Sequence, residues 1–462
     1  MSEGLIQKQA DVQGLSTAIL LPSADLFGGP VRKGVGPLTQ VVGIGLFQRT
    51  VLTLQRAGIR QLIVLAGPEE DQLKQALAKG PRVTIPVRWM PVREFPLDDP
   101  RTWEALAAEV HGFCLLCGVG GVFSRPLIEQ LRQDVQDGQV IVVARDPGAG
   151  RLRSSKAGVR LPSFGGTGGP AAADLVVLPA TVLSAAGQMG GDSGSVPVRR
   201  WLERAAADGR VRVLAAGADR AQWYQEVRNA ADIRSAERRL FSSLKGEFEG
   251  FVDRYFNRKL SRWFTRAFLA LGLSPNAITI LATVVGLVAA AGFGLGTYQA
   301  GIAAAILFQL AAVIDCCDGE VARLTFTESP FGAWLDIAMD NVVHMAIFGG
   351  IAVGSFVQTS GSPLAWVPLA LGAAAVLGNA LSFALVNRAQ KIKQASGWKT
   401  PVNAAWSDFM LKNVASRDFS VVVLVFALFG RLDWFLWMAA VGSIVFALIM
   451  VWVVRPAAIS HA

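Results

Sequence analysis

The stretch that decides the fold is DCCDGEVARLTFTESPFGAWLDIAMD, residues 315–340. It lies in the most apolar part of the chain, yet it carries four aspartates: Asp315, Asp318, Asp336 and Asp340. Spacings of three and four residues place each pair on one face of a helix. The first pair closes one apolar segment and the second opens the next, with a short turn through Ser329 and Pro330 between them. The pattern therefore predicts that the four carboxylates converge at one depth.

Four carboxylates this close repel one another and are costly to keep in a low-dielectric site. Divalent cations would offset that cost, and hard oxygen ligands suit Mg²⁺ or Mn²⁺. A metal with open coordination positions would bind phosphate oxygens. A water-filled polar pathway or a set of interhelical salt bridges is the alternative interpretation, but the single arginine of the stretch, Arg323, cannot neutralise four carboxylates.

The whole chain has 462 residues, of which 52% are hydrophobic and 17% charged. That is too apolar for an ordinary soluble protein. Residues 1–265 contain charges, glycines and loops, whereas residues 275–455 are almost continuously apolar. Six segments of the second part are long enough to span a membrane, the fifth being short: 276–297, 300–321, 334–357, 363–386, 418–432 and 434–454. We therefore predict a soluble half followed by an all-α domain of six transmembrane helices over 275–455.

The net charge of +9 would allow nucleic-acid binding, but the basic residues cluster beside the apolar half, in 254–266 and 388–417. A basic zone that faces anionic lipid explains this placement better. The loops after the first and third spans carry no charge, so the positive-inside rule places both termini and the soluble domain in the cytoplasm, with the protein in the cell (inner) membrane. Residues 250–271, GFVDRYFNRKLSRWFTRAFLAL, alternate aromatic and basic residues at helical spacing, which predicts an amphipathic interfacial helix within a linker over 241–274.

Residues 1–240 alternate strand-like and helix-like runs, which predicts a doubly wound α/β domain. Six runs are typical of buried strands: TAILLP, QLIVLAG, FCLLCG, QVIVVA, DLVVLP and VRVLAAG. Cys114 and Cys117 lie in the third run, with no second cysteine pair and no nearby histidine. We expect them to be buried core thiols in a reducing cytoplasm rather than a zinc or redox site.

The full spacing of the opening stretch is Asp-x2-Asp-Gly-x2-Ala-Arg-x8-Gly-x3-Asp-x3-Asp. All eight positions match the signature of the CDP-alcohol phosphotransferase (CDP-alcohol phosphatidyltransferase) family, which the chain resembles over about residues 245–455. The resemblance implies an integral-membrane enzyme that moves a substituted phosphate group from a CDP-alcohol to an acceptor alcohol and releases CMP. It also implies membrane lipids as partners, phospholipid or phosphodiester biosynthesis as the setting, and a homodimer.

The same resemblance assigns roles to the motif. The four aspartates would hold two divalent ions, Mg²⁺ or Mn²⁺, and Asp340 would be the general base that takes the proton of the acceptor hydroxyl. The glycines would let a nucleotide approach the helix backbone, and the arginine would pair with phosphate. The implied nucleotide-binding residues are Asp318, Gly319, Ala322, Arg323 and Gly332.

Three basic residues at the cytoplasmic rim are candidates for binding an acceptor phosphate: Arg388, Lys391 and Arg417. The alternative is positive-inside charge without a ligand. SRDFS at 416–420 resembles a segment of the inositol-phosphate-using branch of the family, which favours an inositol phosphate as acceptor, with a glycerol phosphate as the alternative. His344 lies one turn beyond Asp340, and we expect it to pack between helices rather than to serve as a ligand.

The start of the soluble half, ILLPSADLFGGPVRKGVGPLTQ, resembles the start of the sugar-phosphate nucleotidyltransferases. It departs from them where their chemistry would lie. Gly36 stands at the lysine position, CGVGGVF (117–123) lacks the first metal-binding aspartate, and Gln225 and Val227 stand where the second is expected. We therefore expect this nucleotidyltransferase-like domain to be catalytically degenerate.

The order of the two halves resembles the bifunctional inositol-1-phosphate cytidylyltransferase/di-myo-inositol phosphate phosphate synthases. In those enzymes the soluble half makes CDP-inositol and the membrane half consumes it. Without the first activity, CDP-diacylglycerol or another lipid-linked CDP-alcohol becomes the expected donor. Three alternatives stay open: a bifunctional enzyme that makes its own CDP-alcohol, an inactive membrane-anchored regulatory protein, and a transporter with a carboxylate ion path.

Overall fold

The chain divides into two compact units, Met1–Ser243 and Leu244–Ala462. The computed structural model describes residues 14–22, 34–81, 83–135, 139–144, 172–189, 196–217, 221–244, 258–396 and 419–454, with the side chains of 258–259, 389–396 and 452–454 left out. Each unit has its own hydrophobic core.

Seven strands form the central sheet of the first unit: β1 (Leu15–Leu21), β4 (Gln61–Ala66), β5 (Val87–Pro91), β6 (Phe113–Gly118), β8 (Val140–Ala144), β9 (Ala172–Pro179) and β10 (Val211–Ala215). Their order is β10-β8-β9-β6-β1-β4-β5. Neighbours are parallel except in the two pairs that involve β9. All six predicted strands are present. The antiparallel direction of β9 was not predicted, because a buried apolar run indicates a strand but not its direction.

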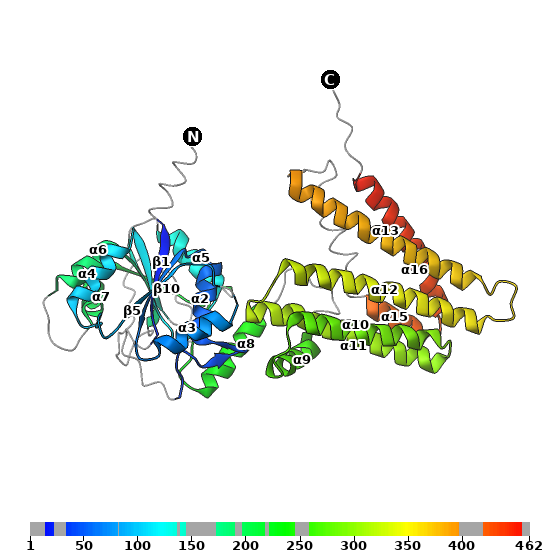
Figure 1. Ribbon diagram of the computed structural model, residues 1–462, viewed down its shortest axis with the longest axis horizontal. Coiled ribbons are helices and arrows are strands. Elements are labelled where there is room, and N and C mark those ends of the chain that lie inside the picture. The colour runs from blue at the N-terminus through cyan, green and yellow to red at the C-terminus, as the bar shows by residue number, and fades with distance from the viewer. Residues whose placement is uncertain are drawn as a thin grey trace, which may run out of the picture. The chain divides into compact units, whose positions relative to one another are not determined.

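Helices cover both faces of this sheet, which confirms the predicted α/β class (Figure 1). One face carries α2 (Leu46–Arg56), α3 (Glu70–Lys79) and α5 (Arg125–Asp134), and the other carries α4 (Pro100–Glu109), α6 (Ala180–Gly187) and α7 (Pro197–Ala207). Trp103, Leu183 and Leu202, from the latter three helices, join the strands in one core cluster. Two small ribbons, β2 (Gln40–Val41) with β3 (Ile44–Gly45) and β7 (Gly121–Phe123) with β11 (Tyr224–Glu226), and the helix α8 (Ala230–Ser243) complete the unit.

The two cysteines of β6 are buried, as predicted. Burial raises the pKa of the Cys114 thiol to about 12, and it raises the pKa of the Cys117 thiol further, with a smaller contribution from the nearby Asp174. Because the thiolate is the reactive form, both groups are inert near neutral pH.

The second unit is helical in its described elements: α9 (Arg258–Ala270), α10 (Pro275–Gly294), α11 (Tyr298–Thr325), α12 (Pro330–Gln358), α13 (Val367–Ser396), α15 (Phe419–Leu428) and α16 (Leu432–Val454). Five of them, α10 to α13 and α16, are long and apolar enough to cross a membrane, which makes this a multi-pass membrane protein. α15 corresponds to the fifth predicted segment. Its ten described residues extend about 15 Å, half of the hydrocarbon thickness of a bilayer.

α11 and α12 both pack along α10. The crossing of α10 with α12 is close because α12 contributes glycines. A Cβ on Gly350 would lie 2.1 Å from the carbonyl oxygen of Ala290, and a Cβ on Gly354 would lie 2.1 Å from that of Phe293. Small residues allow membrane helices this approach, and here it brings the backbones into contact.

The connection between α11 and α12 is a tight turn with a capping residue on each side. Phe326 ends α11 in the left-handed region (φ 59°), and its N–H bonds the carbonyl of Ala322. The Ser329 hydroxyl then accepts a 3.0 Å hydrogen bond from the N–H of Gly332, with Pro330 at the first helical position. The turn predicted at Ser329-Pro330 therefore starts α12 directly after α11.

Candidate metal centre and active site

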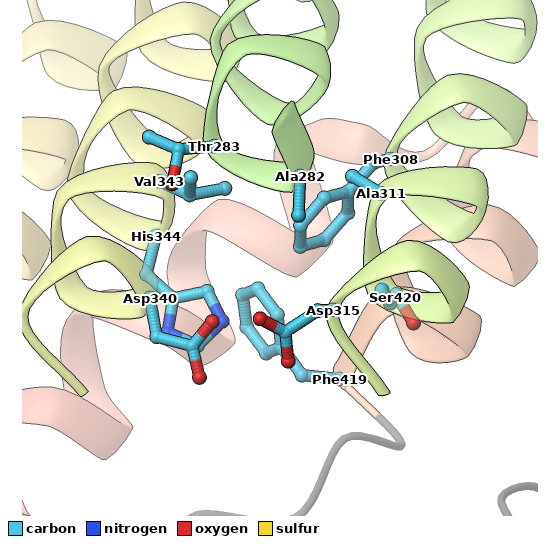
Figure 2. A pocket seen from close by; sticks show the side chains of 11 residues that line it. Ala282, Thr283, Phe308, Ala311, Asp315, Asp340, Val343, His344, Phe419 and Ser420 are labelled. Carbon is cyan, nitrogen blue, oxygen red and sulfur yellow. The ribbon is translucent and has the colours of Figure 1, made fainter. Parts of the chain in front are cut away.

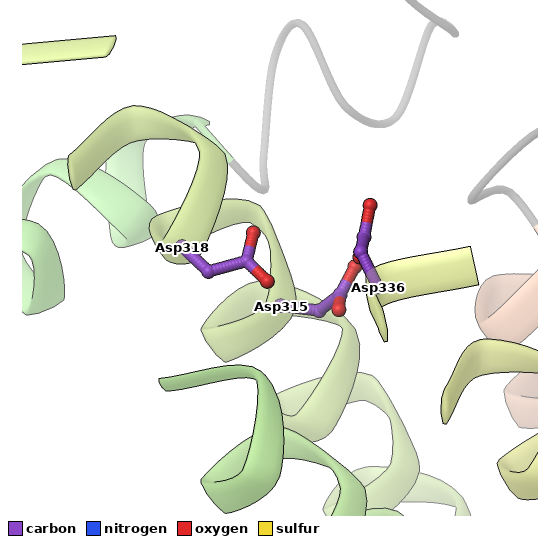
Figure 3. A group of neighbouring side chains, drawn as sticks. All are labelled: Asp315, Asp318 and Asp336. Atoms are coloured by element: carbon purple, nitrogen blue, oxygen red, sulfur yellow. The ribbon is translucent and has the colours of Figure 1, made fainter. Parts of the chain in front are cut away.

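Three carboxyl groups of the motif come together near the end of α11 and the start of α12. Asp315 and Asp318 project from α11 and Asp336 from α12, and one oxygen of each lies within 4.8 Å of the others (Figure 3). Asp315 and Asp318 are only 7% and 5% exposed, and Asp336 is half-buried. Residues 21 positions apart in the sequence thus share one small polar volume in an otherwise apolar unit.

The carboxyl group of Asp318 has a fixed orientation. The Thr279 hydroxyl donates a hydrogen bond to one of its oxygens, and the backbone N–H of Gly319 donates to the other. Thr279 lies in the first turns of α10, which begins where the Ser274 hydroxyl accepts from the N–H of Ala277. The sequence analysis missed Thr279. The available signal was a polar residue early in an apolar span that packs beside an acidic helix.

Asp340 lies one turn beyond Asp336 and lines a pocket together with Asp315 (Figure 2). Residues from α10, α11, α12 and α15 form the wall, among them Thr283, Phe308, His344 and Phe419. Asp315 belongs both to the group of three aspartates and to the wall of the pocket. The metal-binding group and the pocket are therefore continuous. Of the four carboxylates expected to converge, three therefore form a close group and the fourth lies in the adjoining pocket.

His344 packs against aromatic rings, as the sequence analysis expected. Its ring centroid lies 4.8 Å from that of Phe419 and 6.4 Å from that of Phe308. It also lines the pocket that contains Asp340, which was not predicted (Figure 2).

Neighbouring side chains lie close to the two glycines of the motif. A Cβ on Gly319 would lie 3.2 Å from Nη1 of Arg323, so the guanidinium covers this glycine. Arg323 is exposed, while Ala322, Gly319 and Gly332 are half-buried. A Cβ on Gly332 would lie 3.2 Å from Oδ1 of Asn276, so the start of α10 borders the start of α12 here.

The motif stretch contains a further acidic residue, Glu320, for which the sequence analysis predicted no role. It is 5% exposed, and its two carboxyl oxygens accept hydrogen bonds from Ser261 and Thr265 of α9. Glu320 therefore faces another helix and is separate from the three grouped aspartates.

The predicted acceptor-binding residues are placed only in part. Arg388 is exposed on α13. The side chain of Lys391 and the whole of Arg417 lie outside the described residues. Their proposed role is therefore argued from the sequence alone.

In the first unit, the two segments expected to carry metal-binding aspartates lie side by side, because β7 pairs with β11. Val119, just before β7, is buried. In β11 the amide of Gln225 donates to the carbonyl of Glu226. The Glu226 carboxylate, which the sequence analysis overlooked, forms a 2.5 Å ion pair with Arg228. Gly36 has open space beside it.

The grouped aspartates fit a hard divalent cation. All three donors are carboxylate oxygens, and their spacing lets one ion reach them together. Sulfur and imidazole donors, which softer metals prefer, do not belong to this group. The group can therefore hold a hard divalent cation.

Comparison with known proteins agrees with this geometry. The family model for "CDP-alcohol phosphatidyltransferase" matches residues 272–454. A "Bifunctional IPC transferase and DIPP synthase" of Rubrobacter xylanophilus is 27% identical over 360 residues, which are 74% of this chain and 78% of the relative. One of the same name from Aquifex aeolicus is 31% identical over 150 residues, so the match spans about a third of each protein. An "Archaetidylinositol phosphate synthase" of Pyrococcus horikoshii is 37% identical over 89 residues, 19% of this chain and 46% of the relative.

The matched segment contains the grouped aspartates, the pocket and all five candidate spans. The alignment with the Rubrobacter xylanophilus protein covers 74% of the chain, more than either compact unit alone, so it includes residues of both. Over residues 272–454, most of its second unit, the chain is similar to the CDP-alcohol phosphatidyltransferase family.

Proposed function

We propose that this protein is an integral-membrane CDP-alcohol phosphotransferase, which transfers a substituted phosphate group from a CDP-alcohol to an acceptor alcohol and releases CMP. One observation carries the proposal. Carboxyl groups from α11 and α12 lie within 4.8 Å of one another, in direct continuity with a pocket that contains Asp340. If the three grouped aspartates held the diphosphate of the donor, the adjoining pocket would leave room for the acceptor beside it.

In the reaction, the acceptor oxygen forms a new bond to the phosphorus that carries the donor alcohol. The anhydride bond to CMP breaks, and CMP leaves with the electron pair. Asp340 takes the proton of the acceptor hydroxyl, since it lies in the pocket beside the grouped carboxylates. Charge and atoms balance: one phosphoanhydride becomes one phosphodiester, CMP and a proton.

Asp315, Asp318, Asp336 and Asp340 would hold two divalent cations, Mg²⁺ or Mn²⁺. When bound, these cations supply positive charge that stabilises the diphosphate and the departing CMP. The protein contributes the orientation: the hydroxyl of Thr279 and the N–H of Gly319 fix Asp318.

The donor nucleotide would lie against the surface formed by the small residues of the motif on α11 and α12. Gly319, Ala322 and Gly332 add little side-chain bulk to this face. The exposed guanidinium of Arg323, which lies over Gly319, would turn from that glycine to a phosphate of the donor. A lipid-linked donor such as CDP-diacylglycerol suits a site between membrane helices. Arg388, Lys391 and Arg417 are proposed to bind a phosphate on the acceptor, an inositol or glycerol phosphate.

The setting is also part of the proposal. We place the protein in the cell membrane as a homodimer, with the active site and the soluble domain (1–240) on the cytoplasmic side, residues 241–274 as the linker and interfacial helix, and 275–455 as the membrane domain. Its products would be phospholipids or related phosphodiesters.

The direct test is CMP release by the purified protein with Mn²⁺ or Mg²⁺, CDP-diacylglycerol and a panel of acceptors. Asp340→Ala is expected to lower the rate by about 10²–10⁴-fold, the range for losing a general base. Asp433→Ala, at the start of α16, is the control and should behave as wild type. If wild type releases no CMP with any acceptor, a transporter or an inactive regulatory protein becomes the better explanation. Full activity after exhaustive chelation would instead contradict the metal-binding role of the aspartates.

A bifunctional enzyme is the second candidate, because the alignment with a relative named as bifunctional extends into the soluble unit. The absence of an acidic residue at positions 117–123 counts against it, so we propose a non-catalytic soluble domain that stabilises the membrane unit, supports dimerisation or binds a regulator. The Asp340→Ala protein, incubated with CTP and inositol or sugar phosphates, is expected to release no pyrophosphate. Clear pyrophosphate release would establish the bifunctional alternative.

A further inference from the structure

Glu320 is a buried carboxyl group that the proposed reaction does not use. It lies on α11 two residues after Asp318. Two residues correspond to about 200° of rotation around a helix, so the two side chains leave α11 on opposite sides. Asp318 faces α10, where Thr279 donates to it, whereas Glu320 faces α9. A single turn of α11 thus carries one acidic residue of the metal group and one that does not belong to it.

The partners of Glu320 are two hydroxyl groups one turn apart on α9. Ser261 donates to one carboxyl oxygen at 3.0 Å, and Thr265 donates to the other at 2.7 Å. Both serine and threonine are fully buried (0% exposed). A third contact joins α9 and α11 at this point: the Cys317 thiol donates a weak hydrogen bond, 3.5 Å long, to the carbonyl oxygen of Ser261. Buried acceptors are costly to leave unsatisfied, so this set fixes how α9 lies against α11.

The other sides of α9 have different surroundings. Phe268 packs in a core cluster with Ile278, Ile314 and Val321, from α10 and α11. Leu260 and Trp263 are 40% and 66% exposed, and Arg266 is exposed as well. Exposed Trp, Leu and Arg on one short helix beside membrane spans are typical of a helix that lies in the lipid headgroup region.

We propose that Glu320 is a positioning residue that links the interfacial helix α9 to the metal-binding turn of α11. Because Glu320 and Asp318 share one helical turn, a displacement of α9 is transmitted to the orientation of Asp318, and through it to the grouped carboxylates. This inference rests on the proposed function, since it concerns the affinity of the same site for its cations.

Mn²⁺ binding to the full-length protein, followed by electron paramagnetic resonance without substrate, tests the link directly. Thr265→Val combined with Ser261→Ala removes both donors and keeps the size of the α9 residues similar. We expect this double variant to raise the Mn²⁺ dissociation constant roughly tenfold, the lower end of the effect for outer-shell partners of metal ligands. Thr265→Ser keeps the hydroxyl and is expected to bind Mn²⁺ as wild type does.

Two further measurements separate positioning from general damage. CMP release by the double variant should return to the wild-type rate at high Mn²⁺, whereas a damaged fold would lower the rate at every Mn²⁺ concentration. Ser382→Ala is the matched control: it removes a buried hydroxyl that bonds the carbonyl of Gly378 in its own helix, at 2.7 Å, and it should leave Mn²⁺ affinity unchanged.

Equal Mn²⁺ affinity in wild type and the folded double variant would overturn the link. If the double variant does not fold, the Mn²⁺ affinities of Thr265→Val and Thr265→Ser are compared instead. Equal affinities in these two variants would also overturn the link between α9 and the metal-binding turn. A wild type that binds no Mn²⁺ contradicts the proposed function itself, so the two failures can be told apart.

Discussion

At the scale of single residues, the grouped carboxylates are held by donors that lie outside their own motif. Asp318 depends on Thr279 from α10 for one oxygen and on its neighbour Gly319 for the other. Its orientation is therefore fixed before any cation arrives. Preorganised ligands of this kind lose little conformational freedom when the ion binds.

Replacing Asp318 with asparagine is expected to weaken metal dependence without removing the acceptor for Thr279. Asn keeps the size and one oxygen but removes the negative charge, and divalent cations favour charged oxygen ligands. We expect the Mn²⁺ concentration for half-maximal CMP release to rise on the order of tenfold, which corresponds to about 1.4 kcal/mol of binding free energy. An unchanged Mn²⁺ titration would contradict metal binding at Asp318. Asp433→Asn serves as the control.

The motif residues could be named from the sequence because their spacing is regular on helices. Thr279, Ser261 and Thr265 could not, because single hydroxyl residues in apolar helices are common and most bond their own helix, as Ser382 does here. Glu320 is two residues from Asp318, so the sequence shows an acidic residue there but gives no sign that it has a separate role. Its separate partner became evident only when α9 was placed against α11.

At the scale of helices, the crossing of α10 and α12 sets how far apart the site-bearing elements lie. We expect Gly350→Ala to destabilise the membrane unit by about 1–3 kcal/mol, because the new methyl group would enter the backbone of α10 and push the helices apart. Thermal unfolding in detergent measures this effect. Gly349→Ala is the matched control, because a Cβ on the adjacent Gly349 meets nothing within 4 Å.

In that comparison Gly349→Ala should leave the unfolding temperature unchanged or raise it slightly, because alanine favours helix more than glycine does. Equal losses in the two variants would mean that the close crossing does not limit stability. The sequence predicted the helices themselves but not this contact: both glycines look alike in the run IFGGIAVG, and only the crossing distinguishes them.

The degree of burial explains why some strands could be predicted from the sequence and why one of the sheet strands was missed. β6 and β9 are buried along almost their whole length, and both were found in the sequence. β5 buries only Met90, so its pattern gave no strand signal. The fifth apolar segment was predicted over 418–432, whereas the helix α15 ends at Leu428. An apolar run indicates burial or lipid contact but does not show where a helix ends.

At the scale of the whole molecule, the proposed orientation places the loops at the two ends of α12 on opposite sides of the membrane. All four native cysteines are buried, so a new surface cysteine can be labelled selectively. With intact cells and a membrane-impermeant maleimide, we expect labelling of Ser362→Cys, in the exposed loop after α12, and none of Thr327→Cys, in the loop before it. Thr327→Cys should react once the cells are opened.

Labelling of Thr327→Cys in intact cells would invert the proposed topology and place the active site outside the cytoplasm. The charge pattern of the loops predicts the opposite orientation. The order of soluble half and membrane half could be predicted from the sequence, because composition changes sharply near residue 270.

The connection between α11 and α12 leaves four residues, 326–329, between the two helices. Each residue inserted within α12 between Pro330 and Asp336 would shift Asp336 by about 100° around the helix axis and turn it away from α11. Insertions or deletions within the helical stretches 315–325 and 330–340 should therefore separate the aspartates, whereas the segment 359–366 at the far end of α12, which is largely exposed, can change in length without cost to the site.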